Sequence, residues 1–232
     1  MGKSIGMKIQ DYLLGAQIMI DNAIGDAEIL EEVSKYGYNQ EKLQYGKNLY
    51  TLLVELHNNQ KKEYGEQLEA TEELNKIWEE TDKLYMKALK VARVALQGNL
   101  KADNAMMIDG PRKQSLSGWL VQVEAFYRNL LKDDNMLVKM SEFGYDIKKI
   151  EVEYELFKKV SEKNLKQKKE RGEAQEATEK RDNKLDELDK WLSDFRAIAK
   201  VALSDTAQKL EKLGIIARYE KRNVKKANED MV

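Results

Sequence analysis

The sequence contains no cysteine, a single proline and a single histidine in 232 residues. Without cysteine the chain has neither disulfides nor thiolate metal ligands. Helical di-metal sites use paired histidines, so we assign the lone His57 to an ordinary position on a helix surface. Proline interrupts helices most strongly, and its scarcity favours extensive helix. We predict no catalytic residue, no cofactor and no bound metal.

Long apolar runs and an excess of charge of one sign are also absent. No run reaches the roughly 18 apolar residues of a membrane-spanning helix. The segment Met1–Gly6 lacks the apolar core of a signal peptide. The formal net charge of −1 gives no overall attraction to nucleic acid or to anionic membranes. We therefore expect a soluble cytoplasmic protein.

The sequence does contain one polar segment that occurs twice. Residues 60–72 read QKKEYGEQLEATE, and residues 167–179 read QKKERGEAQEATE. The shift in residue number that carries the first copy onto the second also carries Gly37 onto Gly144. Self-similarity at a fixed offset is typical of a duplicated architecture. The sequence therefore predicts an internal duplication.

The duplication divides the chain into three parts. We expect a first helical repeat over residues 7–110, a second over 114–214, and a basic amphipathic tail over 215–232. The border between the repeats is marked by Asp109-Gly110-Pro111, the strongest helix-breaking signal in the chain. We expect the two repeats to pack together as one unit. We also expect Asp26, Asp133 and Ser204-Asp205 to cap short helices.

Each repeat contains a long segment with helical periodicity. Apolar residues recur in one unbroken heptad register from about residue 40 to 97, and again from about 147 to 203. This pattern predicts two continuous helices, each about 85 Å long, that run through Gly65 and Gly172. A glycine inside a helix costs only about 1 kcal/mol. The alternative is a helical hairpin at Tyr64–Gly65.

The long segments are apolar at both ends and polar in the middle. A helix that is polar all round is not buried there, so each long helix is expected to bridge two packed regions. We predict an all-α fold: an internally duplicated, elongated helical bundle with two long antiparallel helices and short capping helices. Leu49, Leu53 and Leu56 would then face Trp191, Phe195 and Ile198. Leu84, Ala88 and Val91 would face Leu156 and Val160. Gly65 and Gly172 would let the backbones approach closely where the helices cross.

Three blocks carry a resemblance to known sequences: residues 172–179 (GEAQEATE), residues 194–203 (DFRAIAKVAL) and residues 210–215 (LEKLGI). They resemble the blocks of a family of uncharacterised bacterial two-copy all-helical proteins. The resemblance covers most of the chain. It implies the duplicated helical architecture, and it implies no activity, ligand or catalytic residue.

The repeated polar segment holds rows of glutamates at helical spacing. These rows consist of Glu66, Glu69, Glu72, Glu173, Glu176 and Glu179. If the two segments cross, their carboxylates could converge on a cation. The alternative is a solvated face that neighbouring lysines neutralise.

The tail combines basic and apolar residues at helical spacing. Its possible partner-binding residues are Arg218, Lys221, Arg222, Lys225 and Lys226. Basic amphipathic segments bind nucleic acid, anionic surfaces or grooves on partner proteins.

These patterns together favour a non-enzymatic structural or interaction protein, a rigid elongated helical scaffold. A protein partner or self-association is then expected. The alternative is nucleic-acid or anionic-surface binding through the tail, and a more remote one is a hydrolytic or metal enzyme that uses the glutamate rows.

Overall fold

The computed structural model describes residues 8–216, and every regular element within them is an α-helix. The predicted all-α class is confirmed for this part of the chain. The helices are α1 (Ile9–Gly25), α2 (Ala27–Ser34), α3 (Gln40–Ala95), α4 (Leu100–Ala105), α5 (Leu116–Leu130), α6 (Asp134–Ser141), α7 (Ile147–Ala202) and α8 (Ala207–Lys212).

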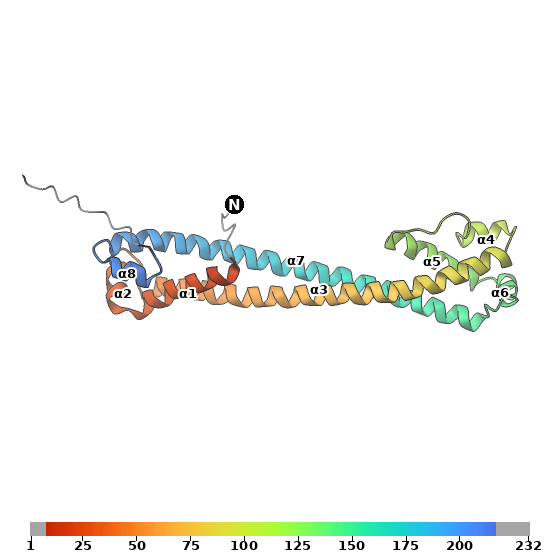
Figure 1. Ribbon diagram of the computed structural model, residues 1–232, viewed down its shortest axis with the longest axis horizontal. Coiled ribbons are helices and arrows are strands. Elements are labelled where there is room, and N and C mark those ends of the chain that lie inside the picture. Colours follow the sequence, from red (N-terminus) through yellow and green to blue (C-terminus); the bar gives the residue numbers. More distant parts are fainter. Residues whose placement is uncertain (1–7, 217–232) are drawn as a thin grey trace, which may run out of the picture. The chain divides into compact units, whose positions relative to one another are not determined.

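The helices form two compact units. Unit 1 consists of Met1–Lys61 and Glu176–Val232, and unit 2 consists of Lys62–Gln175. In unit 1, α1, α2 and α8 lie with the first part of α3 and the last part of α7 (Figure 1). In unit 2, α4, α5 and α6 lie with the last part of α3 and the first part of α7. Each unit therefore mixes residues from both sequence repeats.

The helix starts follow from local capping. The Asp26 carboxylate accepts hydrogen bonds from the backbone N–H groups of Glu28 and Ile29 at the start of α2. Asp133 accepts in the same way from Met136 at the start of α6. Such caps satisfy N–H groups that have no partner within the helix. The predicted caps at Asp26 and Asp133 are confirmed.

The start of α8 differs from its prediction. Ser204 and Asp205 were expected to cap it, but the N-cap position belongs to Thr206, whose side chain makes no capping hydrogen bond. A tight turn precedes this helix, in which the Thr206 N–H donates to the carbonyl oxygen of Leu203. The capping residue therefore lies one position later than the sequence pattern indicates.

Both long helices are continuous. The helix α3 runs for 56 residues through Gly65, and α7 runs for 56 residues through Gly172. The predicted continuity is confirmed, and the alternative of a hairpin at Tyr64–Gly65 is wrong. The two helices pack against each other.

The direction of this packing follows from contacts inside each unit. In unit 2, Thr71 contacts Gln167, and Glu73, slightly further along α3, contacts Lys163, one turn earlier on α7. In unit 1, a Cβ added at Gly46 would meet the Trp191 ring. Tyr38, which precedes α3, packs on Phe195, one turn later on α7. The helices are therefore antiparallel within each unit.

The element boundaries also repeat along the chain. Adding 107 to the bounds of α2, α3 and α4 gives the bounds of α6, α7 and α8. The same shift carries the left-handed glycine after α2, Gly37 (φ 83°), onto the one after α6, Gly144 (φ 76°). Only glycine adopts this backbone conformation without a steric cost. Positions related by this shift therefore occupy the same place in their helices, and we call them corresponding positions.

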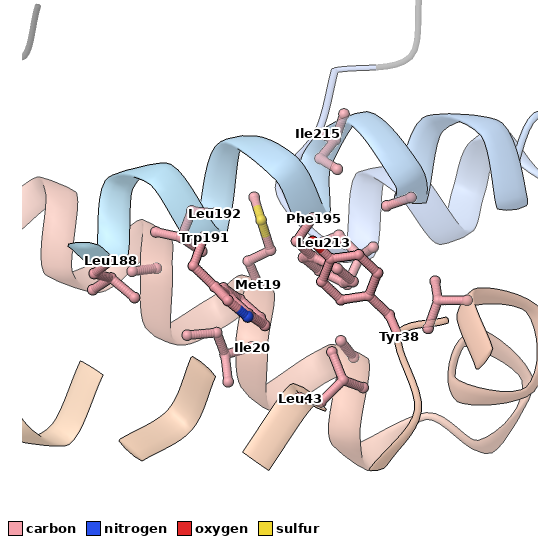
Figure 2. Packing of buried hydrophobic residues seen from close by; sticks show 14 of the residues in the cluster. Met19, Ile20, Tyr38, Leu43, Leu188, Trp191, Leu192, Phe195, Leu213 and Ile215 are labelled. Carbon is pink, nitrogen blue, oxygen red and sulfur yellow. The ribbon is translucent and has the colours of Figure 1, made fainter. Parts of the chain in front are cut away.

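The core of unit 1 is built around aromatic rings from α7 (Figure 2). Trp191 and Phe195 stack with centroids 5.4 Å apart, and Tyr38 meets the Trp191 ring edge-on at 5.8 Å. A Cβ at Gly46 would lie 2.4 Å from the Trp191 ring, so the indole lies directly on the backbone of α3. Only glycine allows this approach. Leu53 lies in the same core, which confirms its predicted grouping with Trp191 and Phe195.

The core of unit 2 contains more aromatic residues. Tyr85, Trp119, Phe126 and Tyr127 are fully buried there, and Trp119 also packs on Phe157 with ring centroids 6.0 Å apart. Edge-to-face contacts link the rings, as between Phe126 and Tyr127 at 5.0 Å and 89°. Such pairs add roughly 0.5–1.5 kcal/mol beyond the area that they bury.

Three leucines that were predicted to lie in the cores do not belong to them. Leu56, Leu84 and Leu156 are half-buried and belong to neither core. A second correction concerns the glycines, because Gly65 and Gly172 are exposed and a Cβ at either position would meet nothing within 4 Å. They therefore do not mediate a close approach of the backbones. Within the repeated segments the buried small residues are instead alanines: Ala70, Ala174 and Ala177.

Candidate functional site

Three glutamates of unit 2 converge where the long helices are polar. Glu63 and Glu66 lie almost one turn apart on α3, and Glu170 approaches them from α7. One carboxylate oxygen of each lies within 4.8 Å of the others. All three side chains are half-buried. We call this group the glutamate cluster, and among residues 8–216 it is the one group of three or more His, Cys, Asp or Glu with metal-like spacing.

Lysines accompany the glutamate cluster on both helices. Lys62 Nζ lies 3.2 Å from Glu66 and 3.8 Å from Glu63, and Lys169 Nζ lies 3.3 Å from Glu173. The hydrogen bonds to Glu66 and Glu173 raise the pKa values of Lys62 and Lys169. The carboxylates therefore already have cationic neighbours from the chain itself. Hard cations such as Ca²⁺ take roughly 6–8 oxygen ligands, so three carboxylates that each offer one oxygen would leave several ligand positions to water.

The glutamates that converge are only partly the predicted ones. Of the rows named from the sequence, Glu66 belongs to the cluster, whereas Glu69 and Glu72 are exposed. Glu176 pairs with Lys180 at 2.6 Å, and the hydrogen bond from this lysine lowers the pKa of Glu176. Carboxylates of the two helices can converge only if they lie on the helix face that meets the neighbouring helix. Glu63 and Glu170 lie on the heptad seam and fulfil this condition, but they were not in the predicted rows.

A second polar group joins α3 to α7 within unit 2. The Glu73 carboxylate accepts hydrogen bonds from Lys163 Nζ at 2.8 Å and from Lys166 Nζ at 3.3 Å. These bonds lower the pKa of Glu73. Gln167 donates to the Thr71 hydroxyl at 3.4 Å nearby. Polar contacts thus hold the two helices together where the heptad seam is no longer apolar.

His57 is buried, which corrects the predicted surface position. Its side chain is 7% exposed, and neither ring nitrogen has a hydrogen-bond partner among the described residues. Burial lowers its pKa, and Lys61 and Arg181 lower it further. His57 lies on the heptad face that packs against α7, whereas its polar neighbours in the sequence suggested exposure. The imidazole is thus a neutral core residue with cations nearby.

The most buried carboxylate, Glu153 in unit 2, was missed from the sequence. It is 3% exposed, and it accepts a 2.9 Å hydrogen bond from the Tyr127 hydroxyl. Burial raises its pKa, while Tyr127, Lys149 and Lys87 act in the opposite direction. Burial together with Glu153 also raises the pKa of Tyr145 to about 12. The sequence did contain a signal for the burial of Glu153. It corresponds to Gly46, the residue at which the heptad register of the first long segment begins.

The five basic tail residues lie outside the described residues. Arg218, Lys221, Arg222, Lys225 and Lys226 therefore stay a prediction, as does nucleic-acid or surface binding through them. Ile215, the first residue of the predicted tail, belongs to the core of unit 1, in which it is 6% exposed.

The comparisons with known proteins find no relative. No family model matches the chain, and no curated protein and no solved structure matches it. Within residues 8–216, no helix has the length and the apolar character needed to span a membrane.

Proposed function

We propose that this chain is a non-enzymatic structural or interaction protein, a rigid helical scaffold that acts in the cytoplasm. The observation that carries the proposal is the continuity of α3 and α7, each of which contributes residues to the cores of both units. A 56-residue helix is about 84 Å long. A chain whose two cores share such long helices is suited to present a binding surface on each unit.

We further propose that the scaffold arose by internal duplication. The repeated segments in the sequence and the matching bounds of α2–α4 and α6–α8 support this origin. The corresponding capping aspartates Asp26 and Asp133 support it too. After such a duplication, each long helix contributes one of its two ends to each core.

The polar middle of the long helices fits the same proposal. Lysines pair with the glutamates there, and the residues buried in the repeated segments are alanines. Exposed ion pairs of this kind contribute little to stability, and they keep long helices soluble. These features fit a middle segment whose charged side chains keep contact with water.

Small-angle scattering of the purified chain tests the proposal. A compact protein of this length has a radius of gyration of about 17 Å. The scaffold predicts a clearly larger value, because about 84 Å of continuous helix does not fit into a compact particle. Gly65→Pro, which breaks the helix interior, is expected to shift the scattering curve, and the matched Gly65→Ala is expected to leave it unchanged. A wild-type radius of gyration equal to that of a compact protein would contradict the proposal.

A further inference from the structure

The loop that joins α4 to α5 contains Asp109-Gly110, the one place in the sequence where an aspartate or asparagine precedes a glycine. Both residues are exposed, and neither belongs to a helix (Figure 1). Inside a helix the backbone N–H groups are held by carbonyl oxygens, which keeps the peptide nitrogens away from neighbouring side chains. Asp109 and Gly110 lack this protection, so the side chain of Asp109 is free to react with the backbone that follows it.

Arg93 of α3 holds the loop on both sides of Asp109. Its Nε donates a hydrogen bond to the carbonyl oxygen of Ile108 at 2.8 Å, and its Nη2 donates to the carbonyl oxygen of Gly110. One guanidinium therefore binds the carbonyl groups of the two residues that flank Asp109. The backbone at Asp109 is fixed in this way, while the residue itself stays exposed to water.

Gln122 of α5 anchors the two ends of the same loop. This residue is buried, and its Nε2 donates to the carbonyl oxygen of Met107 at 3.0 Å. Its Oε1 accepts a hydrogen bond from the Lys113 N–H at 2.9 Å. Asp109 and Gly110 therefore lie in the outer part of a loop whose ends are fixed inside unit 2.

This loop conformation places the Asp109 carboxyl group beside the next peptide nitrogen. The Gly110 N–H donates to Asp109 Oδ1 at 2.8 Å. Gly110 has a φ of 81°, which glycine adopts without strain, and it has no Cβ to shield its nitrogen. Two groups that are held side by side in one chain react far faster than the same groups free in solution. The pair that the loop holds together is a carboxyl carbon and an amide nitrogen.

We propose that Asp109 is a site of spontaneous isomerisation to isoaspartate. The Gly110 nitrogen attacks Asp109 Cγ, and the new C–N bond replaces the bond from Cγ to its hydroxyl oxygen. The hydroxyl group leaves with the amide proton as water, and a five-membered succinimide ring remains. Water then opens the ring at one of its two carbonyl groups. Opening at Cγ restores aspartate, and opening at the backbone carbonyl gives isoaspartate, so the cycle returns the water that it released and needs no other reactant.

Isomerisation changes the loop that Arg93 holds. In isoaspartate the chain continues through Cβ and Cγ, so the backbone between Ile108 and Gly110 becomes one atom longer. The guanidinium of Arg93 cannot then bind both carbonyl oxygens in the present geometry. We therefore expect isomerised chains to unfold at a lower temperature, because unit 2 loses a contact between α3 and this loop.

Incubation of the full chain in weakly acidic buffer made with ¹⁸O-labelled water tests the proposal, because each ring opening introduces one heavy oxygen atom. Trypsin releases Asp109 in the peptide 102–112. Fragmentation of this peptide should place heavy oxygen and isoaspartate at position 109. Their rate of appearance should be several times higher than at any other aspartate of residues 8–216. A position 109 that gains no more heavy oxygen than the other aspartates would overturn the proposal.

Two variants and a peptide sharpen the test. Asp109→Glu is the matched control, because its side chain would have to form a six-membered ring, and it should gain no label at position 109. Asp109→Asn closes the same ring with loss of ammonia and should convert faster than the wild type. After equal incubation, the wild type should unfold at a lower temperature than Asp109→Glu.

The synthetic peptide 102–112 shows what the fold contributes. The folded chain should label position 109 at least as fast as the free peptide, because the loop holds the carboxyl group beside the Gly110 nitrogen. A folded chain that reacts several times more slowly than the peptide would contradict this arrangement.

Discussion

At one corresponding position, unit 1 has Gly46 and unit 2 has Glu153. In unit 1 the glycine leaves room for the Trp191 ring, which lies against the backbone of α3. In unit 2 the glutamate is itself buried and accepts a hydrogen bond from Tyr127. The position that corresponds to Trp191 is Leu84, a smaller residue. In unit 1 the large Trp191 of α7 is thus matched by the small Gly46 of α3.

The comparison teaches how one framework holds two different cores. The bounds of α3 and α7 agree when 107 is added, although corresponding buried residues differ in type, as Gly46 and Glu153 do. The buried polar groups of the two cores also differ. The Trp191 indole N–H has no hydrogen-bond partner among the described residues, whereas the buried Glu153 carboxylate accepts a hydrogen bond from Tyr127. The packing of Trp191 should therefore contribute to stability in unit 1, and the titration of Glu153 should contribute in unit 2.

Removal of the Trp191 indole should lower the free energy of unfolding the most. Trp191→Ala leaves a cavity above Gly46 and is expected to cost about 3–5 kcal/mol, as for other buried aromatic residues. The control is Leu84→Ala at the corresponding position, which is half-buried and should cost clearly less. Urea unfolding of both variants measures the difference, and equal losses would contradict the packing of Trp191 on Gly46.

Substitutions at the glycines should act in opposite directions. Gly46→Ala places a Cβ 2.4 Å from the rigid Trp191 ring and is expected to destabilise unit 1 by about 1–3 kcal/mol. Gly65→Ala meets nothing within 4 Å and is expected to stabilise the helix by about 1 kcal/mol. Thermal unfolding of the two variants measures the direction of each change in stability. A stabilising Gly46→Ala would rule out the close approach of Trp191.

The Glu153 carboxyl should make unit 2 less stable toward higher pH. Its folded-state pKa is raised by burial, so the folded chain keeps a proton that the unfolded chain releases. The associated stability is full below the unfolded pKa and is lost as the pH rises through the folded value. Glu153→Gln keeps an acceptor for Tyr127 and removes the titration. Unfolding free energies measured from about pH 4 upward should therefore fall less steeply in this variant, and identical slopes would argue against the buried carboxyl.

His57 should make unit 1 less stable toward lower pH. Its folded-state pKa is lowered, so the unfolded chain binds a proton more readily than the folded one. The associated stability is full above the unfolded pKa, about 6.5, and is lost as the pH falls toward the folded value. Asn164 occupies the corresponding position of α7, so His57→Asn is the natural comparison. Wild type should lose stability as the pH falls below about 6.5, and the variant should lose much less.

The large features of the fold could be predicted from the sequence. The heptad register indicated both long helices through Gly65 and Gly172, and the apolar ends of the segments indicated two mixed cores. These inferences succeed because helical periodicity, and the constant offset between the similar segments 60–72 and 167–179, can be read directly from the sequence.

The details of the site could not be predicted in the same way. Which glutamates converge depends on how each helix is rotated toward the other, and this rotation is fixed by packing at the ends. The burial of His57 and Glu153 follows from the same rotation. Polar residues on a heptad seam were taken as exposed, although the helix face and not the residue type decides their burial. The corresponding position Gly46 was the available signal for Glu153.

The continuity of the long helices can be measured directly with two spin labels on cysteines in an otherwise cysteine-free chain. Labels at Thr51 and Glu79, both exposed, lie on either side of Gly65. A continuous helix places the two backbone positions about 42 Å apart, with a narrow distribution. The corresponding pair on α7, Lys158 and Asp186, should give the same distance. A distance of about 10 Å, as between adjacent helices of a hairpin, or a broad distribution in either pair would contradict the account.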